Sequence, residues 1–284
     1  MNRIAANQKQ AKLDKKIRVG IVNYLNTKPL LYGLQHSPII NDIVLIQDHP
    51  AAIATQLLDG SIDLGLVPVA VIPKLPVAYI IGNHCISCDG PVASVCLFSE
   101  VPIAEVKTVL LDYQSKTSVE LAKLMLRHYW RINPELVYTQ ADYQSEIKGT
   151  TAGLVIGDRA LTQRSISPFV YDLGEAWKIR TGRPFVFAAW VSHRELDPAF
   201  VAAFEEANSL GLQNINNVLA EVSHPSFDLE EYYTKYIQYK LDENKKDAME
   251  LLLFALNSRA KLRWITETGE EMIRPVDREV NKSF

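Results

Sequence analysis

The stretch IRVGIVNYLNTKPL, residues 17–30, decides how the fold is interpreted. Its first part is a short run rich in β-branched residues, which predicts a buried strand. Asn26 and Thr27 follow, and then Pro29, a residue favoured in the first turn of a helix. We therefore expect a strand that leads directly into a helix, with polar side chains at the junction.

The next segments repeat this pattern. A second apolar run, Ile43–Gln47, is followed by a predicted helix that Pro50 opens and Gly60 ends. A third apolar run, Ile62–Val69, closes the series. Alternating strands and helices are typical of a parallel sheet covered by helices.

A second α/β unit with a different sequence comes next. We expect, in chain order, a strand over Thr108–Asp112, a helix over Thr117–Trp130, a strand near Leu136–Thr139, a short helix over Asp142–Lys148 and a strand over Gly153–Asp158. From Asp197 onward every periodic segment is predicted to be helical, including AMELLLFALNSRAKL at residues 248–262.

Two extended stretches, Val92–Ser99 and Phe185–Ser192, are expected to cross between these units. This arrangement predicts an α/β protein with two lobes. Lobe 1 comprises residues 17–97 and 191–284, lobe 2 comprises residues 98–190, and residues 1–16 form a mobile polar tail. In such a protein the cleft between the lobes is the natural ligand site.

The composition is that of a soluble globular protein with about two domains. Of the 284 residues 48% are hydrophobic and 22% charged, which excludes a disordered chain. A formal net charge of −3 argues against a nucleic-acid partner. The most apolar stretch, residues 66–82, is interrupted by three prolines and is shorter than a membrane span of about 20 residues. We therefore expect no membrane segment and a small-molecule partner.

The cysteines Cys85, Cys88 and Cys96 are too few and too clustered for a disulfide framework, which fits a reducing compartment. No apolar run typical of a signal peptide follows the polar amino terminus, so we expect a cytoplasmic protein. Cys85 and Cys88 have the C-x-x-C spacing, but zinc needs four ligands and no second pair is present. We predict packing thiols, no metal and, without a P-loop or G-x-G-x-x-G, no bound cofactor.

The segment Asp112–Glu120, DYQSKTSVE, is the strongest candidate for a binding site. It lies between a predicted strand and a predicted amphipathic helix, whose unpaired amides favour a carboxylate or a phosphate. Either Ser115 or Thr117 has the spacing of a helix cap, and Ser118 adds a further hydroxyl. An ordinary well-capped helix is the alternative interpretation.

Two other junctions carry small polar groups. Asn26 and Thr27 offer neutral donors and acceptors beside a helix start, although Asn26 also suits a simple helix cap. Ser87 and Gly90 belong to a turn signature that ends at Val92, and the turn alone explains this pattern.

Two more residues are weaker candidates. Asp158 ends a predicted strand beside Arg159, where a structural ion pair is the alternative. Trp190 belongs to the aromatic stretch FVFAAW, whose rings suit either the core or a flat ligand.

Five motifs together resemble the chorismate dehydratase family, the first enzymes of the futalosine route to menaquinone. They are YLNTKPL (residues 24–30), DGPVASVCLFS (89–99), LDYQSKTSVELAKLML (111–126), VIGDRAL (155–161) and YDLGEAWKIRTGRPFVFAAWV (171–191). Each motif alone is weak, but five in order are specific. The resemblance covers residues 17–191 well and the remainder loosely.

The resemblance implies a type II periplasmic-binding-protein-like fold and the removal of water from chorismate, giving 3-[(1-carboxyvinyl)oxy]benzoate. It implies that Asn26 and Ser87 contact the reacting part of the ligand. The other residues expected at the substrate are Thr27, Gly90, Val92, Ser115, Thr117, Ser118, Asp158 and Trp190. Since neither Asn26 nor Ser87 is a good base, a carboxylate of the substrate is expected to take the proton.

Two positions depart from the family pattern: Arg183 replaces an apolar residue, and Cys88 replaces another small residue. Two other functions stay open: a non-catalytic solute-binding protein for an aromatic or dicarboxylic acid, and the sister dihydroxynaphthoate synthase. The sequence does not predict the oligomeric state.

Overall fold

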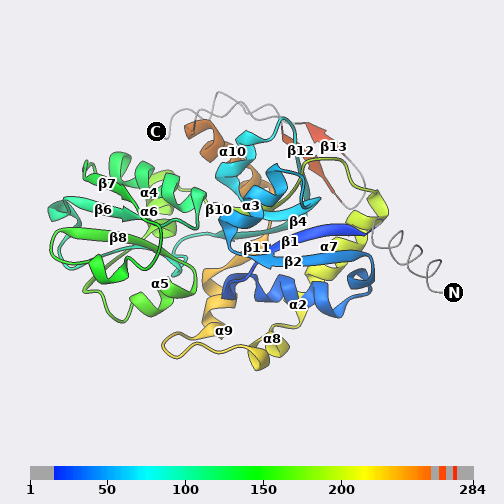
Figure 1. Ribbon diagram of the computed structural model, residues 1–284, viewed down its shortest axis with the longest axis horizontal. Helices are drawn as coiled ribbons and strands as arrows, with labels where there is room; N and C mark the ends of the chain where they lie inside the picture. The colour runs from blue at the N-terminus through cyan, green and yellow to red at the C-terminus, as the bar shows by residue number, and fades with distance from the viewer. Residues whose placement is uncertain (1–15, 257–261, 267–270, 274–284) are drawn as a thin grey trace.

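The computed structural model describes residues 16–256, 262–266 and 271–273, and it has two β-sheets with helices packed around them (Figure 1). The predicted tail, residues 1–16, lies outside the described residues except for Lys16. Within the described ranges, no helix is both long enough and apolar enough to cross a membrane.

The larger sheet has the strand order β13-β12-β4-β10-β3-β1-β2, and β11 also pairs with β4. Its strands are β1 (Ile17–Val22), β2 (Ile43–Asp48), β3 (Leu64–Pro68), β4 (Ala78–Cys88), β10 (Phe185–Ser192), β11 (Gln238–Lys240), β12 (Leu262–Ile265) and β13 (Glu271–Ile273). Strand β1 pairs in parallel with both β2 and β3, so the predicted parallel unit is confirmed.

Helices and short turns surround this sheet. They are η1 (Leu25–Thr27), α2 (Lys28–His36), η2 (Pro38–Asn41), α3 (Pro50–Leu58), η3 (Val69–Lys74), α7 (Pro198–Gln213), α8 (Ile215–Glu221), α9 (Leu229–Glu231), the π-helical η6 (Tyr232–Tyr236) and α10 (Glu243–Ala255). Helix α2 has Pro29 in its first turn, as expected. It packs closely on α7, because a Cβ atom on Gly33 would lie 1.9 Å from the carbonyl oxygen of Ala207.

The smaller sheet has the order β7-β6-β8-β5-β9. Its strands are β5 (Val95–Ser99), β6 (Thr108–Leu111), β7 (Glu135–Tyr138), β8 (Thr151–Ile156) and β9 (Phe169–Asp172), and its helical segments are η4 (Ile103–Glu105), α4 (Lys116–His128), η5 (Gln144–Glu146), α5 (Asp158–Gln163) and α6 (Leu173–Thr181). Helix α4 buries an apolar face that includes Leu121, Ala122 and Met125. Its amphipathic sequence therefore positions its first turn firmly against the sheet.

The chain passes from the larger sheet to the smaller one through residues 89–94 and returns through residues 182–184. Phe185–Ser192, expected to cross between the lobes, instead forms β10, which pairs with β3 and β4 of the larger sheet. The chain therefore passes from one sheet to the other several residues before the lobe boundaries expected at 97/98 and 190/191. Figure 1 shows the smaller sheet to one side of the larger one, with the connections between them.

Two predicted helices differ from the structure. Residues 142–148 contain only the short turn η5, because Asp142 has a positive φ of 26° and the buried Tyr143 hydroxyl donates to Asp112 and to the carbonyl oxygen of Leu154. Helix α10 ends at Ala255, before residue 262, where β12 begins and pairs with β4. Sheet pairing outweighs local helical periodicity here.

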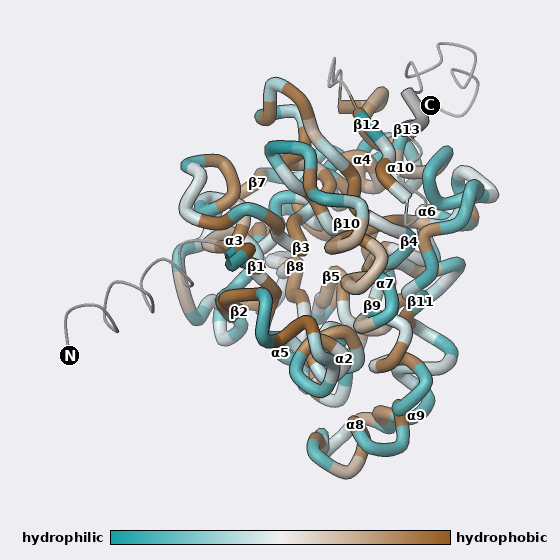
Figure 2. Tube along the Cα trace, turned by 90° about the vertical axis from the view of Figure 1, so that its right-hand side faces the viewer, coloured by the Kyte–Doolittle hydropathy of each residue, from teal (hydrophilic) through white to brown (hydrophobic). Residues whose placement is uncertain are grey.

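Buried apolar side chains form the core of the fold. Figure 2 shows apolar residues along strand β2 and a mixture of polar and apolar residues around α8 and α9. The fully buried side chains include Trp177, Trp190 and Phe204. These rings and the apolar strand faces form a core that fixes the polar junctions between the sheets.

Candidate functional site

A cleft lies between the two sheets and has an empty volume of about 530 Å³, part of it open to solvent. Its lining comes from both sheets and from the first connection: Val22, Tyr24, Asn26, Thr27, Pro50, Leu66, Pro68, Ile86, Val92, Ser94, Val95, Ser115, Ser118, Ile156, Gly157, Phe187 and Ala188. Five of the ten predicted site residues are in this lining: Asn26, Thr27, Val92, Ser115 and Ser118.

Asn26 presents an unpaired acceptor at the cleft. It lies in η1, directly after β1, and its backbone carbonyl accepts a hydrogen bond from the Tyr239 hydroxyl at 2.9 Å. Its side-chain Oδ1 is buried and has no hydrogen-bond partner among the described residues. A buried, unpaired acceptor is costly, so this atom is suited to a ligand donor. Thr27, not Asn26, precedes α2 as its N-cap residue.

The Thr27 hydroxyl is already occupied. It donates to the carbonyl oxygens of Val22 and Tyr24, at 2.5 and 2.8 Å. Thr27 therefore shapes the wall of the cleft and holds η1 against the end of β1, while Asn26 carries the unpaired atom.

The start of α4 contributes two hydroxyls. Ser115 is the N-cap residue, and its Oγ accepts from the Ser118 amide at 3.2 Å. The Ser115 and Ser118 hydroxyls are 2.9 Å apart. The cap is therefore Ser115 rather than Thr117, and the Ser118 hydroxyl is the additional polar group beside it. Both residues line the cleft at the positive end of the helix dipole.

Thr117 points elsewhere. It is fully buried, and its Oγ1 accepts from the backbone amide of Ala70 at 3.1 Å. Ala70 belongs to η3 of the larger unit. Thr117 therefore joins α4 to the larger unit and is not part of the lining.

Ser87 is not in the lining of the cleft. Its hydroxyl is fully buried and donates to the Gln238 carbonyl oxygen of β11 at 2.6 Å. Neighbouring side chains of a strand point to opposite faces, and Ile86 faces the cleft. The serine near this turn that lines the cleft is Ser94, which the sequence reasoning missed. Ser94 is the last residue of DGPVAS, so the sequence offered it as a second polar candidate near this turn.

The remaining predicted residues also lie outside the lining. Gly90, with a φ of 128°, belongs to the turn before Val92. Trp190 is fully buried and packs edge-on against Phe204 of α7, with ring centroids 4.8 Å apart. It is a core residue, which is the alternative that its aromatic stretch allowed.

Asp158 connects the two units. Its Oδ1 accepts from the Leu25 amide at 2.9 Å, and Leu25 opens η1. Burial raises the pKa of this carboxyl, while the Leu25 amide opposes the shift. Asp158 therefore holds the Asn26 turn against the start of α5, although it does not line the cleft itself.

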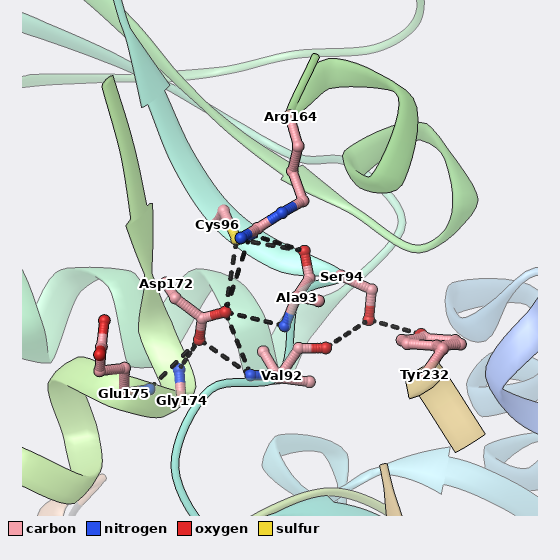
Figure 3. A network of polar contacts seen from close by, with 9 residues as sticks. All are labelled: Val92, Ala93, Ser94, Cys96, Arg164, Asp172, Gly174, Glu175 and Tyr232. Atoms are coloured by element: carbon pink, nitrogen blue, oxygen red, sulfur yellow. Dashed lines mark hydrogen bonds and ion pairs between the residues drawn. The ribbon is translucent and has the colours of Figure 1, made fainter. Parts of the chain in front are cut away.

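The connection that carries Ser94 is held by Asp172 (Figure 3). The Asp172 carboxylate accepts from the backbone amides of Val92 at 3.0 Å and Ala93 at 2.8 Å. It also caps α6 through the next amides of its own chain. Ala93 has a positive φ of 62°, and the Ser94 amide donates back to the Val92 carbonyl at 2.7 Å. Asp172 thus supports a strained turn that residues other than glycine rarely adopt.

A second polar cluster lies behind Tyr24. The Tyr24 hydroxyl donates to Gln114, which also accepts from Arg159 at 2.9 Å. Arg159 Nη2 is 2.6 Å from the buried Asp112 carboxylate, which also accepts from Tyr143. Burial raises the pKa of Asp112, and the Arg159 guanidinium opposes this shift. The cluster connects the cleft wall to the segment before α4.

No residue in the lining of the cleft, as far as the structure describes the chain, is an Asp, Glu, His, Lys or Arg. The described ranges also contain no group of three or more His, Cys, Asp or Glu residues that could hold a metal ion. Burial raises the pKa of Cys85 to about 12 and that of Cys88 well above its usual value, so both thiols stay protonated. The cleft offers hydroxyls, an amide and helix amides, which suit an anionic organic ligand.

Comparisons with known proteins agree with this fold. Protein AF1704 from Archaeoglobus fulgidus has a TM-score of 0.65 at 14% identity and covers 86% of this chain and 98% of its own. The periplasmic aliphatic sulphonate binding protein SsuA from Escherichia coli has a TM-score of 0.54 at 16% identity, over 86% of this chain and 87% of its own. The predicted two-lobed, periplasmic-binding-protein-like fold is therefore confirmed.

Sequence similarity gives the family. A chorismate dehydratase of Thermus thermophilus is 30% identical over 263 residues, which cover 84% of this chain and 93% of that protein. The model of the menaquinone biosynthesis family matches residues 17–257, which include both sheets' main strands and every residue of the cleft. The chain belongs to the menaquinone biosynthesis family.

Proposed function

We propose that this protein is a chorismate dehydratase, a lyase that removes one water from chorismate to give 3-[(1-carboxyvinyl)oxy]benzoate. The observation that carries the proposal is the meeting of Asn26, Ser94 and the Ser115–Ser118 pair in one cleft without charged side chains. The relative from Thermus thermophilus, which bears this name, supports it.

The two carboxylates of chorismate match the polar groups of the cleft. One carboxylate binds at the start of α4, where the Ser115 and Ser118 hydroxyls and the helix dipole favour negative charge. The other end of the ligand then faces η1 and the first connection, which carry Asn26 and Ser94. Fixing both ends holds the ring in one geometry and disfavours rearrangement or loss of the enolpyruvyl group.

Dehydration removes the ring hydroxyl and a neighbouring ring proton, and the product is aromatic. In this proposal Ser94, which lines the cleft, donates a hydrogen bond to the leaving hydroxyl, and the unpaired Oδ1 of Asn26 accepts from the substrate. Since the lining contains no carboxylate, imidazole or amine among the described residues, a carboxylate of chorismate itself takes the proton. The leaving hydroxyl departs as water once it has gained that proton. A cytoplasmic location belongs to the same proposal.

The test is incubation of the purified protein with chorismate. A new aromatic absorbance and a product lighter by one water are expected, with heat-inactivated protein as the control. Binding without turnover would instead favour a solute-binding protein, and turnover of only a futalosine-derived compound would favour the sister synthase.

A further inference from the structure

Ser94 is held from a second side by a buried tyrosine. Tyr232 opens the π-helical turn η6, and its hydroxyl donates to Ser94 Oγ at 2.7 Å. Figure 3 shows the connection between its two supports: Asp172 binds the backbone on one side and Tyr232 reaches the hydroxyl from the other. The two contacts act on different atoms, since Asp172 fixes the chain and Tyr232 fixes the direction of the serine hydroxyl.

The Tyr232 hydroxyl is the donor of this hydrogen bond. The ring is fully buried, and burial raises the pKa of its hydroxyl well above the ordinary value. The phenol therefore keeps its proton and can donate it in this hydrogen bond. Ser94 Oγ accepts the hydrogen bond, so its own hydrogen points elsewhere.

The Ser94 hydrogen has only a weak partner within the described part of the chain. The Val92 carbonyl lies 3.5 Å from Ser94 Oγ, at the outer limit of a hydrogen bond. A ligand oxygen in the cleft at ordinary distance competes easily with such a contact. A hydroxyl that accepts one hydrogen bond is also a stronger donor, because linked hydrogen bonds polarise one another.

We propose that Tyr232 is a positioning residue for the reaction: it fixes Ser94 as a hydrogen-bond donor toward the leaving hydroxyl of the substrate. This inference rests on the proposed dehydratase function. π-Helical turns within helical segments occur frequently at functional sites, and here the turn brings a buried phenol to the cleft wall.

The neighbouring Tyr233 provides a matched control. Its hydroxyl is also buried, but it has no hydrogen-bond partner among the described residues. Replacing either tyrosine with phenylalanine removes one buried hydroxyl and keeps the ring. Only Tyr232→Phe removes a contact to the cleft.

The experiment is a double-mutant cycle with Tyr232→Phe, Ser94→Ala, both together, and Tyr233→Phe, all assayed with chorismate. Tyr232→Phe is expected to lower kcat about three- to tenfold with little change in KM, because the contact matters most in the transition state. It is expected to have no further effect on kcat when Ser94 is already alanine. Tyr233→Phe is expected to keep the wild-type kcat.

Equal losses with and without Ser94, or an unchanged kcat in Tyr232→Phe, would overturn the positioning role. Crystal structures of wild type and Tyr232→Phe give a readout that needs no activity. The Ser94 hydroxyl is expected to turn toward the Val92 carbonyl in the variant, and an unchanged rotamer overturns the proposal. If the wild type does not dehydrate chorismate, the proposed function fails, while the Ser94 rotamer still decides whether Tyr232 orients this hydroxyl.

Discussion

The Asp158 carboxylate accepts a hydrogen bond from the Leu25 amide at 2.9 Å, and this contact links the start of α5 to the turn that carries Asn26. The two residues are 133 positions apart in the sequence. Because one belongs to each unit, the contact fixes the width of the cleft at this point. The Asp158 carboxyl is also largely buried, and burial raises its pKa, which makes the contact sensitive to pH.

Asp158→Asn tests this sensitivity. Burial raises the pKa of Asp158 in the folded protein, so the folded state keeps the proton to a higher pH than the unfolded chain. The free energy of unfolding contributed by this group therefore falls as pH rises from the ordinary aspartate pKa, about 4, through the raised pKa. Asparagine does not titrate, and its side-chain oxygen still accepts from Leu25. Urea unfolding at several pH values should show the variant gaining stability relative to wild type toward neutral pH. A pH-independent difference contradicts this assignment.

Asn26→Ala removes the unpaired acceptor in the cleft. We expect kcat to fall about 100-fold, the scale seen for the loss of one transition-state contact, with KM changed much less. Asn23→Ala is the control, since Asn23 is exposed, its side chain accepts from Lys28, and it is not in the lining of the cleft. Steady-state kinetics with chorismate distinguish the two variants, and wild-type turnover in Asn26→Ala removes Asn26 from the mechanism.

Ser115→Ala and Thr117→Val separate binding from stability at the start of α4. Ser115→Ala removes a cap worth about 1 kcal/mol and a cleft hydroxyl, so KM should rise. Thr117→Val leaves the Ala70 amide without its acceptor, which should lower the free energy of unfolding by about 1–3 kcal/mol with a smaller change in KM. Denaturant unfolding and KM for chorismate measure both. The reverse pattern would place Thr117 at the ligand and Ser115 in a purely capping role.

Gly157→Ala should destabilise the protein and disturb Tyr24. Gly157 has a φ of 64°, and an added Cβ would lie 2.9 Å from the Tyr24 ring. The expected loss is about 1–3 kcal/mol in the free energy of unfolding. Gly182→Ala is the comparison, because Gly182 is in the left-handed helical region, with a φ of 70° and a ψ of 3°, and has no atom within 4 Å of an added Cβ. Gly157 has a ψ of −149°, which residues other than glycine adopt at a higher cost. Thermal unfolding should therefore show the larger loss in Gly157→Ala, and equal losses would mean that neither this backbone conformation nor the Tyr24 contact adds to the cost.

Local patterns predicted most of the fold because its central elements obey them. The β-branched run at residues 17–22 forms β1, and Pro29 lies in the first turn of α2, as expected. The hydroxyl-rich segment before Leu121 forms the capped start of α4. The carboxyl end was harder, because β12 forms only by pairing with β4, a strand from the first third of the chain. A strand as short as β12, with four residues, shows too little alternation for its sequence alone to predict this pairing.

The cleft was predictable in outline, but single side chains were not. Ser87 and Ser94 are both small, polar and close to the same turn. The strand alternation of β4 and the positive φ at Ala93 decide which serine lines the cleft, and neither can be read from composition. Trp190 likewise depends on a neighbour, Phe204, that belongs to a different element of the chain.

The close packing of α2 on α7 affects the position of cleft residues, although the contact between the two helices lies away from the cleft. Gly33 belongs to α2 and Gly211 to α7, and an added Cβ on either would lie within 2 Å of a backbone carbonyl oxygen of the other helix. A larger side chain at either position must therefore move the two helices apart. Helix α2 begins immediately after Asn26 and Thr27, and its displacement carries them with it. Gly33 and Gly211 therefore help to set the position of Asn26 and Thr27, although neither glycine lines the cleft. Substitutions at these two glycines offer a way to shift the cleft residues without changing them.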